Sequence, residues 1–489
     1  MRALMICALL LPLAGGLLLP LLRFRSGKSM RVFVGGVTLA VSALAGLLCA
    51  FPPEGTLRVL SFTPTLELAL RIDGTGRIFM ALLAVLWPPA VLYAFDYMEH
   101  ETRQRSFFAW YTLSFFAVLG VAMAANLFSL YLFFEGVTLF TLPLVTHKRD
   151  AASIRAGRRY LVYSLTGATV ALIGIVLLTG GGTMPAFVPG GSVTPEHGAE
   201  ELYRWAFLAA FVGFSVKAAM FPLHAWLPAA SVAPTPVTAL LHAVAVVNAG
   251  AFACLRLTCY TCGTAWLRGS WVQAAVLGLA AFTVLFGSVT AFREKHLKRR
   301  LAWSTVSNLS YILFGIALMT PEGLTAALTH IWAHSLTKIV LFYAAGAVLV
   351  RTGRETVQET RGLGKRMPWT FAAFTLAALS LMGVPPLVGF QSKWNLLEAA
   401  VSSGLPMGMA GFVALLISTV LTAVYGLGVV IPAFFLPPEE AERLPSPGRL
   451  DPSWRMLLPM FLILCPVVLL GLAGAEVTRI FSEFASKLL

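Results

Sequence analysis

Apolar runs of about 20 residues recur along this chain of 489 residues, and they limit its fold more than any other feature. A run of that length crosses the hydrocarbon core of a bilayer as a helix, whose backbone polar groups pair within their own segment. Only 12% of the residues are charged, whereas soluble domains have about 25%. The sequence therefore predicts an all-α integral membrane protein and excludes a water-soluble enzyme domain.

Hydropathy predicts about fourteen membrane-spanning helices. They lie near residues 3–22, 31–51, 76–95, 107–124, 126–146, 160–180, 203–222, 235–257, 271–291, 301–319, 323–350, 369–390, 408–434 and 456–474. Alternate loops, beginning at Arg23–Arg31, hold about 24 of the 36 Lys and Arg residues. Because cytoplasmic loops are enriched in these residues, we expect a multi-pass protein of the cell inner membrane with both termini outside.

The remaining loops contain few chemical signatures. Alternating residues between Pro52 and Arg77 predict a short hairpin on the outer face, and Gly181–Glu201 reads as an exposed loop. No phosphate-binding glycine loop and no zinc-binding spacing is present, so we expect no cofactor and no metal. Cys259 and Cys262 form a lone CxxC, which is weak evidence for a metal and leaves its oxidation state open.

Ionisable side chains interrupt the apolar runs. They are Glu135, Lys217, His242, His330, His334, Lys338 and Lys393. His330, His334 and Lys338 follow one another at intervals of four, which places them on one helical face. A buried charge at the bilayer centre costs about 2.5–3.5 kcal/mol, so such groups persist where they pair or line water. We expect Glu135 to pair with Lys217, and the histidines to pass protons between the lysines.

Prolines flank two of these lysines. Pro222 and Pro228 follow Lys217, whereas Pro385 and Pro386 precede Lys393. Proline removes a backbone donor and breaks a helix. On the predicted topology, the helix that contains Lys217 and the helix that contains Lys393 cross the membrane in opposite directions. The lysine precedes the proline break in the first helix and follows it in the second. Going from one side of the membrane to the other, the lysine and the break therefore come in the same order in both helices. This pattern is typical of inverted repeats with discontinuous helices in secondary transporters.

Several polar residues also have simpler interpretations. His224 lies near the end of its span and reads as a satisfied polar residue, and Lys298 reads as part of a basic anchor; both are secondary candidates. Lys393 is close enough to a helix end to snorkel.

Five stretches resemble the antiporter-like subunit family of respiratory complex I, membrane-bound hydrogenases and multi-subunit sodium/proton antiporters. They are LFFEGVTLFTLPLV, KAAMFPLHAWLPAASVAPTPVTALLHAVAVVNAG, HLKRRLAWSTVSNLSYI, LTHIWAHSLTKIVLFYAAGAVL and GLGKRMPWTFAAFTLAALSLMGVPPLVGFQSKW, within residues 70–400. The resemblance implies two five-helix inverted repeats with discontinuous seventh and twelfth helices. We accordingly expect N-terminal helices and the hairpin in 1–105, the repeats in 106–260 and 261–435, and a C-terminal loop and helix in 436–489.

The resemblance also implies a role for the ionisable row. Glu135, Lys217, His242, Lys338 and Lys393 match the family's relay positions, whereas Asn308 stands where glutamine is common. We expect a subunit that moves protons as part of a larger redox-driven or antiporter complex, with other antiporter-like subunits as partners. Sodium/proton antiport and a mainly structural role in a redox or bicarbonate-uptake complex are the alternatives. Any NADH:quinone oxidoreductase or hydrogenase chemistry would belong to partner subunits.

Overall fold

The chain is mostly helical in a computed structural model that describes residues 1–63, 65–99, 101–180, 182, 184–437 and 448–489. Its first half contains α1 (Arg2–Leu18), α2 (Gly27–Ala50), β1 (Leu57–Ser61), β2 (Glu67–Leu70), α3 (Gly74–Tyr97), α4 (Gln104–Met123), α5 (Leu127–Val145), α6 (Ala151–Thr179), α7 (Glu200–Ser215), α8 (Trp226–Ala229), η1 (Ala230–Val232), α9 (Thr235–Ala243), α10 (Val246–Arg256) and η2 (Leu257–Cys262). Its second half contains α11 (Trp271–Arg293), α12 (Leu297–Ala317), α13 (Pro321–Thr352), η3 (Gln358–Thr360), α14 (Leu363–Arg366), α15 (Pro368–Met382), α16 (Val388–Ser402), α17 (Pro406–Phe435), α18 (Trp454–Leu472) and α19 (Gly474–Ser486).

Ten helical segments of the described chain are long and apolar enough to cross a membrane. The protein is therefore a multi-pass membrane protein. Four other predicted spans correspond to α1, α7, α12 and α15: α12 begins with basic residues, and the other three have 17, 16 and 15 residues. The count of fourteen spans stays a prediction.

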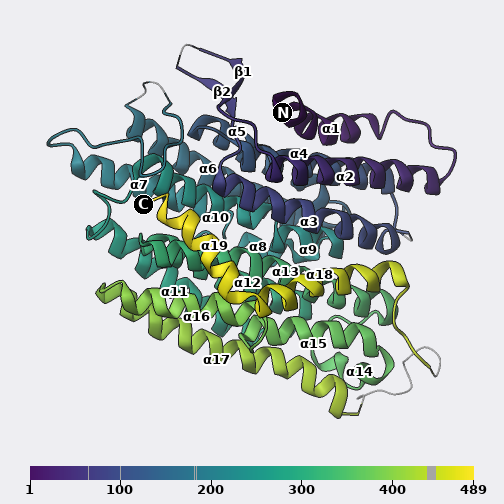
Figure 1. Ribbon diagram of the computed structural model, residues 1–489. Helices are drawn as coiled ribbons and strands as arrows, with labels where there is room; N and C mark the ends of the chain where they lie inside the picture. Colours follow the sequence, from purple (N-terminus) through teal and green to yellow (C-terminus); the bar gives the residue numbers. More distant parts are fainter. Residues whose placement is uncertain (64, 100, 181, 183, 438–447) are drawn as a thin grey trace.

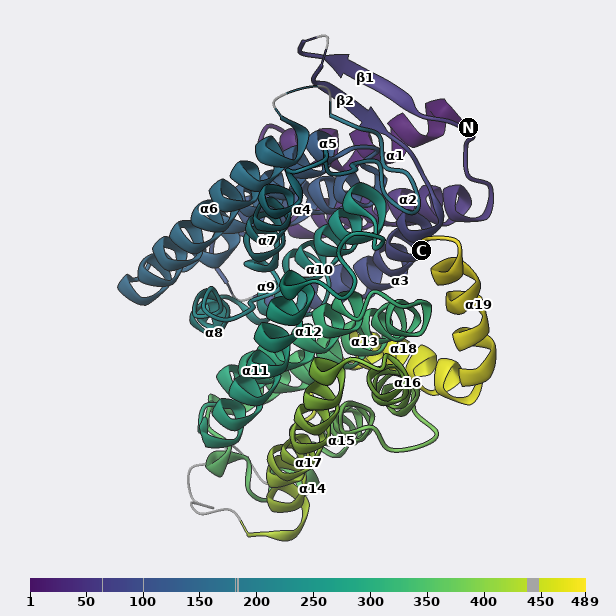
Figure 2. The same cartoon turned by 90° about the vertical axis from the view of Figure 1, so that its left-hand side faces the viewer.

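The helices cross the molecule only broadly in chain order, since α13 packs against α3 and α9 and α11 packs against α17. Figures 1 and 2 show α1 and α2 at one edge and α14 and α17 at the opposite edge. The C-terminal α18 returns to pack against α3 and α13, and α19 continues along α13. Hydropathy does not predict α19, because its 13 residues mix apolar and charged side chains and contain no long apolar run.

The longest helix, α13, forms the centre of the bundle. It packs against α3, α9, α12, α15, α16, α18 and α19. From Gly323 to Val348 every residue except Trp332 is buried. Polar side chains on this helix therefore face protein on all sides and are kept away from lipid.

Non-helical backbone separates α7 from α8. The left-handed region favours glycine, yet Ala219 has φ of +54° there. A cis peptide bond joins Phe221 to Pro222, and Pro222 has no N–H to continue a helix. The indole of Trp226 donates a hydrogen bond to the Val216 carbonyl at 2.8 Å, which satisfies one acceptor that the interruption leaves open.

A shorter interruption separates α15 from α16. Gly383 ends α15 with φ of +90°, the left-handed conformation that commonly closes a helix at glycine. The cis Pro385–Pro386 bond follows, and Val388 begins α16. Whether α7 with α8, and α15 with α16, each act as one discontinuous membrane helix stays a prediction.

A two-stranded antiparallel hairpin lies within the loop between α2 and α3. Leu57 of β1 pairs with Leu70 of β2, and Ser61 pairs with Glu67. The hairpin is fixed to the bundle where α4 meets α5, because the Ala125 N–H donates to the Ala69 carbonyl at 3.0 Å. We call the side of the bundle that carries β1, β2 and the start of α3 the hairpin end.

The predicted exposed loop at Gly181–Glu201 and the predicted C-terminal loop lie partly outside the described residues. Gly181, Thr183 and residues 438–447 are not described. Where it is described, the first of these loops contacts the hairpin end, since the Phe187 N–H donates to the Ala125 carbonyl at 2.9 Å.

Helices α6 and α7 approach each other so closely that only glycine fits between them. A Cβ at Gly213 would lie 2.3 Å from the Ala171 amide nitrogen, a backbone atom that cannot turn aside. We expect Gly213→Ala to lower the free energy of unfolding by about 1–3 kcal/mol through overpacking. Thermal unfolding of the purified chain in detergent measures this change.

The control is Gly36→Ala on α2, because a Cβ there meets nothing within 4 Å. Alanine also favours a helix over glycine, so this variant should keep or raise the unfolding midpoint. Equal midpoints for the two variants would contradict the close approach.

Candidate functional site

Glu135 on α5 and Lys217, two residues after α7, form an ion pair inside the bundle. The Lys217 Nζ lies 3.8 Å from the Glu135 Oε1. It also donates a hydrogen bond to the Phe134 carbonyl and lies 3.5 Å from the centroid of the Phe134 ring. The separation of 3.8 Å exceeds the ~2.7–2.9 Å of a charge-assisted hydrogen bond, so the pair is loose.

The backbone of α10 holds Lys217 in place. A Cβ at Gly250 would come within 2.5 Å of the Ala218 amide nitrogen and 2.9 Å of the Lys217 carbonyl carbon. Only glycine allows α10 to contact this turn so closely. This contact therefore fixes the position of the Lys217 backbone, while the long lysine side chain extends to α5.

His242 lies in the last turn of α9 and is completely buried. Its ring stacks on Phe342 of α13 at a centroid distance of 4.8 Å. Neither ring nitrogen has a hydrogen-bond partner among the described residues. Nearby, the Asn248 side chain on α10 donates to the Ser335 hydroxyl on α13 at 2.7 Å, which ties these two helices together.

His330, His334 and Lys338 lie along the buried α13. The rings of His330 and His334 are 6.3 Å apart. The Nδ1 of His330 lies 3.0 Å from the Ser392 hydroxyl on α16, and its ring stacks on Tyr311 at 5.1 Å. Both ring nitrogens of His334 lack a partner among the described residues.

Lys338 and Lys393 lack a carboxylate partner in the described chain. The Lys338 Nζ donates to the Leu301 carbonyl at 3.0 Å and to the Ser304 hydroxyl, both on α12. The Lys393 Nζ, on α16, lies 3.4 Å from the Thr419 hydroxyl. No Asp or Glu oxygen of the described residues lies within 4.0 Å of either lysine.

These groups form one cluster in space, in which each lies close enough for its positive charge to repel those of its neighbours. His334 interacts with His242, His330 and Lys338. Lys393 interacts with both His330 and Lys338. We call His242, His330, His334, Lys338 and Lys393 the central cluster. The Glu135–Lys217 pair lies apart from it, with no direct contact between Lys217 and His242 in the described chain.

The secondary candidates lie beside this cluster. Lys298 is buried and donates to the Ala233 carbonyl at 3.3 Å, and it interacts electrostatically with His242. His224 packs against Phe286 and Trp303 at 5.0 and 5.5 Å, in an aromatic setting that suits the structural interpretation. The prolines singled out in the sequence lie in or beside the interruptions: Pro222 follows Lys217, Pro228 lies in α8, and Pro385 and Pro386 precede α16.

Sequence reasoning missed the hydroxyl groups that hold the lysines and His330. Ser304, Ser392 and Thr419 contact members of the central cluster. Serine and threonine are common in apolar helices, so the presence of these residues in the sequence did not indicate a functional site. The sequence alone does not place Ser304 opposite Lys338, because that contact depends on how α12 packs against α13.

No metal site is found in the part of the chain that the structure describes. No three His, Cys, Asp or Glu side chains group closely enough there to hold a metal ion. Cys259 and Cys262 both lie in η2, where they are buried and unbonded thiols.

Comparison with known proteins identifies relatives of this arrangement. Residues 124–422 match the family described as NADH:quinone oxidoreductase/Mrp antiporter, TM. The chain is 34% identical over 442 residues to NADH-quinone oxidoreductase subunit N of Desulforudis audaxviator (strain MP104C), covering 87% of this chain and 86% of that protein. It is 30% identical over 481 residues to a probable K(+)/H(+) antiporter component of Rhizobium meliloti (strain 1021). That match covers 96% of this chain and 47% of that protein, so the chain spans about half of its length.

A similar fold occurs in a solved structure of the membrane-bound sulfane sulfur reductase, an archaeal respiratory membrane complex. The TM-score is 0.84 with 23% sequence identity, over 99% of this chain and 97% of that chain. This similarity concerns the fold. The matched family region contains Glu135, Lys217 and the whole central cluster.

We expect the effects on stability of mutating Glu135 and Lys217 to be strongly non-additive. Lys217→Met leaves Glu135 without its counter-charge, and Glu135→Gln leaves a buried ammonium, so each should destabilise the chain by up to about 3 kcal/mol. The double variant should recover most of this loss, because neither charge remains. Unfolding midpoints of the four proteins in detergent measure the coupling.

The matched control is the exposed Arg479–Glu483 pair on α19, whose nitrogen and oxygen lie 2.9 Å apart. Replacing either partner with glutamine should change stability by less than about 1 kcal/mol, as is usual for surface pairs. Additive effects at Glu135 and Lys217 would show that the two side chains do not act as a pair.

Proposed function

Because this chain belongs to the NADH:quinone oxidoreductase/Mrp antiporter transmembrane family, we propose that it moves protons across the membrane as one subunit of a larger complex. The observation that carries the proposal is the central cluster: two lysines and three histidines, all buried and close enough for their positive charges to repel one another, with no carboxylate of the described chain beside the lysines. A protein that needed only a stable core would fill these positions with apolar side chains, which cost nothing to bury.

The unpartnered imidazole nitrogens support a proton pathway. Buried polar atoms are nearly always hydrogen-bonded, either to protein or to water. His242 and His334 together have four ring nitrogens without a protein partner in the described chain. Water that satisfies these nitrogens would also connect them, and imidazole exchanges protons near neutral pH.

The proposed mechanism consists of a path for protons and a switch that controls it. Protons enter from the cytoplasmic half near Lys217 and His242, cross along His334, Lys338 and His330, and leave through Lys393. Glu135 is the switch: its loose contact with Lys217 allows the two charges to separate, and their separation makes it easier for the lysine to release its proton. Lys298, which interacts with His242, offers a contact on the entry side.

The proposal includes an inverted-repeat design for residues 106–260 and 261–435. Its support is that backbone interruptions lie next to Lys217 in the first segment and next to Lys393 in the second. On this topology both termini lie on the outer side of the cell inner membrane. The partners are further membrane subunits, and oxidoreductase chemistry, where the parent complex has it, belongs to them.

Cation antiport is the second candidate, and the relative named as part of a probable K(+)/H(+) antiporter favours it. Sodium prefers oxygen ligands, and carboxylates for it would come from other subunits, since Glu135 is the one carboxylate beside the described relay residues. A mainly structural role in a redox or bicarbonate-uptake complex is a third candidate, which the buried lysines argue against.

Replacing Lys217 or Lys338 by alanine should stop ion movement. In vesicles that contain the complete complex, we expect the initial rate of proton transport to fall at least tenfold in each variant. Pyranine trapped inside the vesicles reports this rate, and repeating the assay with and without Na⁺ separates proton pumping from sodium/proton antiport.

Lys28→Ala is the control, because Lys28 is an exposed lysine at the start of α2 and its loss should leave transport unchanged. Assembly is followed in parallel by co-purification of the partner subunits. Intact proton transport in Lys217→Ala would contradict the proposed relay. If Lys338→Ala impaired the assembly of the complex without impairing transport by the complexes that do assemble, the structural role would be favoured.

A further inference from the structure

A cavity of about 440 Å³ opens at the hairpin end, where the first residues of α3 face the C-terminal end of α19. Its polar wall contains Arg71, Asp73, Arg77 and Lys487. Three of these four side chains are cations. No residue of the proposed proton route lines this cavity.

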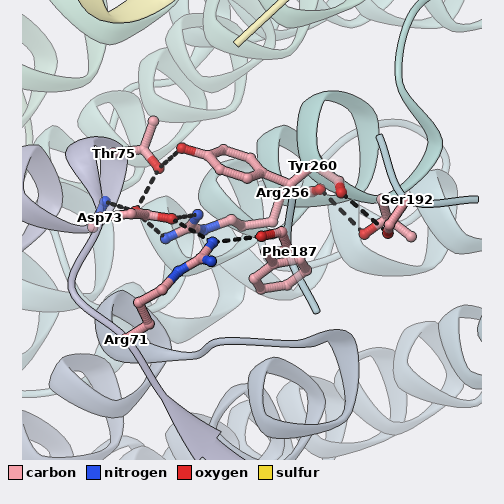
Figure 3. A network of polar contacts seen from close by, with 9 residues as sticks. Arg71, Asp73, Thr75, Phe187, Ser192, Arg256 and Tyr260 are labelled. Atoms are coloured by element: carbon pink, nitrogen blue, oxygen red, sulfur yellow. Dashed lines mark hydrogen bonds and ion pairs between the residues drawn. The ribbon is translucent and has the colours of Figure 1, made fainter. Parts of the chain in front are cut away.

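The single carboxylate of this wall is already engaged. Asp73 accepts hydrogen bonds from both terminal nitrogens of Arg256, one of them at 2.7 Å, and Arg71 lies 3.5 Å away (Figure 3). Burial alone would raise the pKa of Asp73, but Arg256 and, more weakly, Arg71 hold it below its usual value. The negative charge of Asp73 is therefore neutralised by Arg256, which does not line the cavity. Arg71, Arg77 and Lys487 then give the cavity an excess of positive charge.

Two of the cations have nitrogen atoms that are available to bind a ligand. Lys487 is exposed, and its ammonium makes no hydrogen bond or ion pair with the described residues. Arg77 uses its Nε to donate to the Cys49 carbonyl at 2.8 Å, which leaves both terminal nitrogens of its guanidinium without a partner in the described chain. Guanidinium and ammonium groups converging on one cavity recognise phosphate.

The wall also has an apolar part beside the hydroxyls of Thr75 and Tyr260. Phe484 and Leu488 of the C-terminal segment close one side. Gly74, the first residue of the apolar α3, lies in the wall, so the cavity is placed at the edge of a predicted span. α19 turns Val477, Phe481 and Ala485 into the bundle and Glu476, Arg479 and Glu483 outward. The apolar face of α19 thus packs against α13, while its charged face points away from the bundle.

We propose that this cavity binds the phosphate group of an anionic phospholipid, held by Arg77 and Lys487 with Arg71 beside them. The acyl chains then lie along the apolar surface formed with Phe484 and Leu488. A lipid in this position bridges α3 and α19, two segments from opposite ends of the sequence. Phosphatidylglycerol fits this chemistry, whereas phosphatidylcholine carries a compensating positive charge that the cavity disfavours.

Native mass spectrometry of the delipidated full-length chain in detergent tests this site. Dioleoyl phosphatidylglycerol should bind at least tenfold more tightly than dioleoyl phosphatidylcholine. The double variant Arg77→Gln/Lys487→Gln should lose most of this preference. Arg479→Gln is the matched control, because Arg479 lies on the same helix and faces away from the cavity; it should bind as the parent chain does.

Two further measurements keep the test decisive. The single variant Lys487→Gln changes an exposed side chain near the C-terminus, so it should fold normally and still weaken phosphatidylglycerol binding severalfold. Inorganic phosphate at about 10 mM should not displace the lipid, because it lacks the acyl chains that lie on the apolar surface. Equal binding of the two lipids, unchanged binding in Lys487→Gln, or displacement by inorganic phosphate would each overturn the proposal.

Discussion

The whole structure depends on removing the lysines and histidines of α13 and α16 from contact with lipid. An unshielded charge at this depth is unfavourable by several kcal/mol, and a bilayer offers it no partner. α13 is accordingly enclosed by seven other helices, including α18 and α19, which return from the far end of the sequence to cover it. The central place of α13 meets this need, because its polar side chains face protein on every side.

Serine, threonine and backbone carbonyl groups complete what this enclosure begins. Ser304 and the Leu301 carbonyl hold Lys338, and Thr419 approaches Lys393. These neutral acceptors orient an ammonium without neutralising it, so the proton on each lysine is held less firmly than it would be beside a carboxylate. Only Lys217 has a carboxylate partner within 4.0 Å among the described lysines of the relay. The two kinds of lysine environment therefore match the two tasks proposed above, which are switching at Lys217 and proton passage at Lys338.

Much of this arrangement could be predicted from the residues. The family resemblance inferred from the motifs is confirmed, and the expected partner of Lys217 lies beside it, because each stood out as an isolated charge in an apolar run. The neighbours of His242 could not be predicted in this way. It follows Lys217 in the sequence, but the fold places it against Phe342 of α13. α19 and the cavity beside it also escaped notice, since a short amphipathic helix gives no hydropathy signal and Arg256 and Asp73 meet across 183 residues.

The spacing of the polar groups on α13 sets a limit on what this helix can do alone. An α-helix rises about 1.5 Å per residue, so His330 and Lys338 differ in height by about 12 Å. The hydrocarbon core is about 30 Å thick. The row on α13 therefore spans less than half of the insulating layer, and a charge that travels along it is still enclosed at both ends. On the proposed route, the remaining depth is crossed through the interrupted segments next to Lys217 and Lys393, and these two access points need not conduct at the same moment.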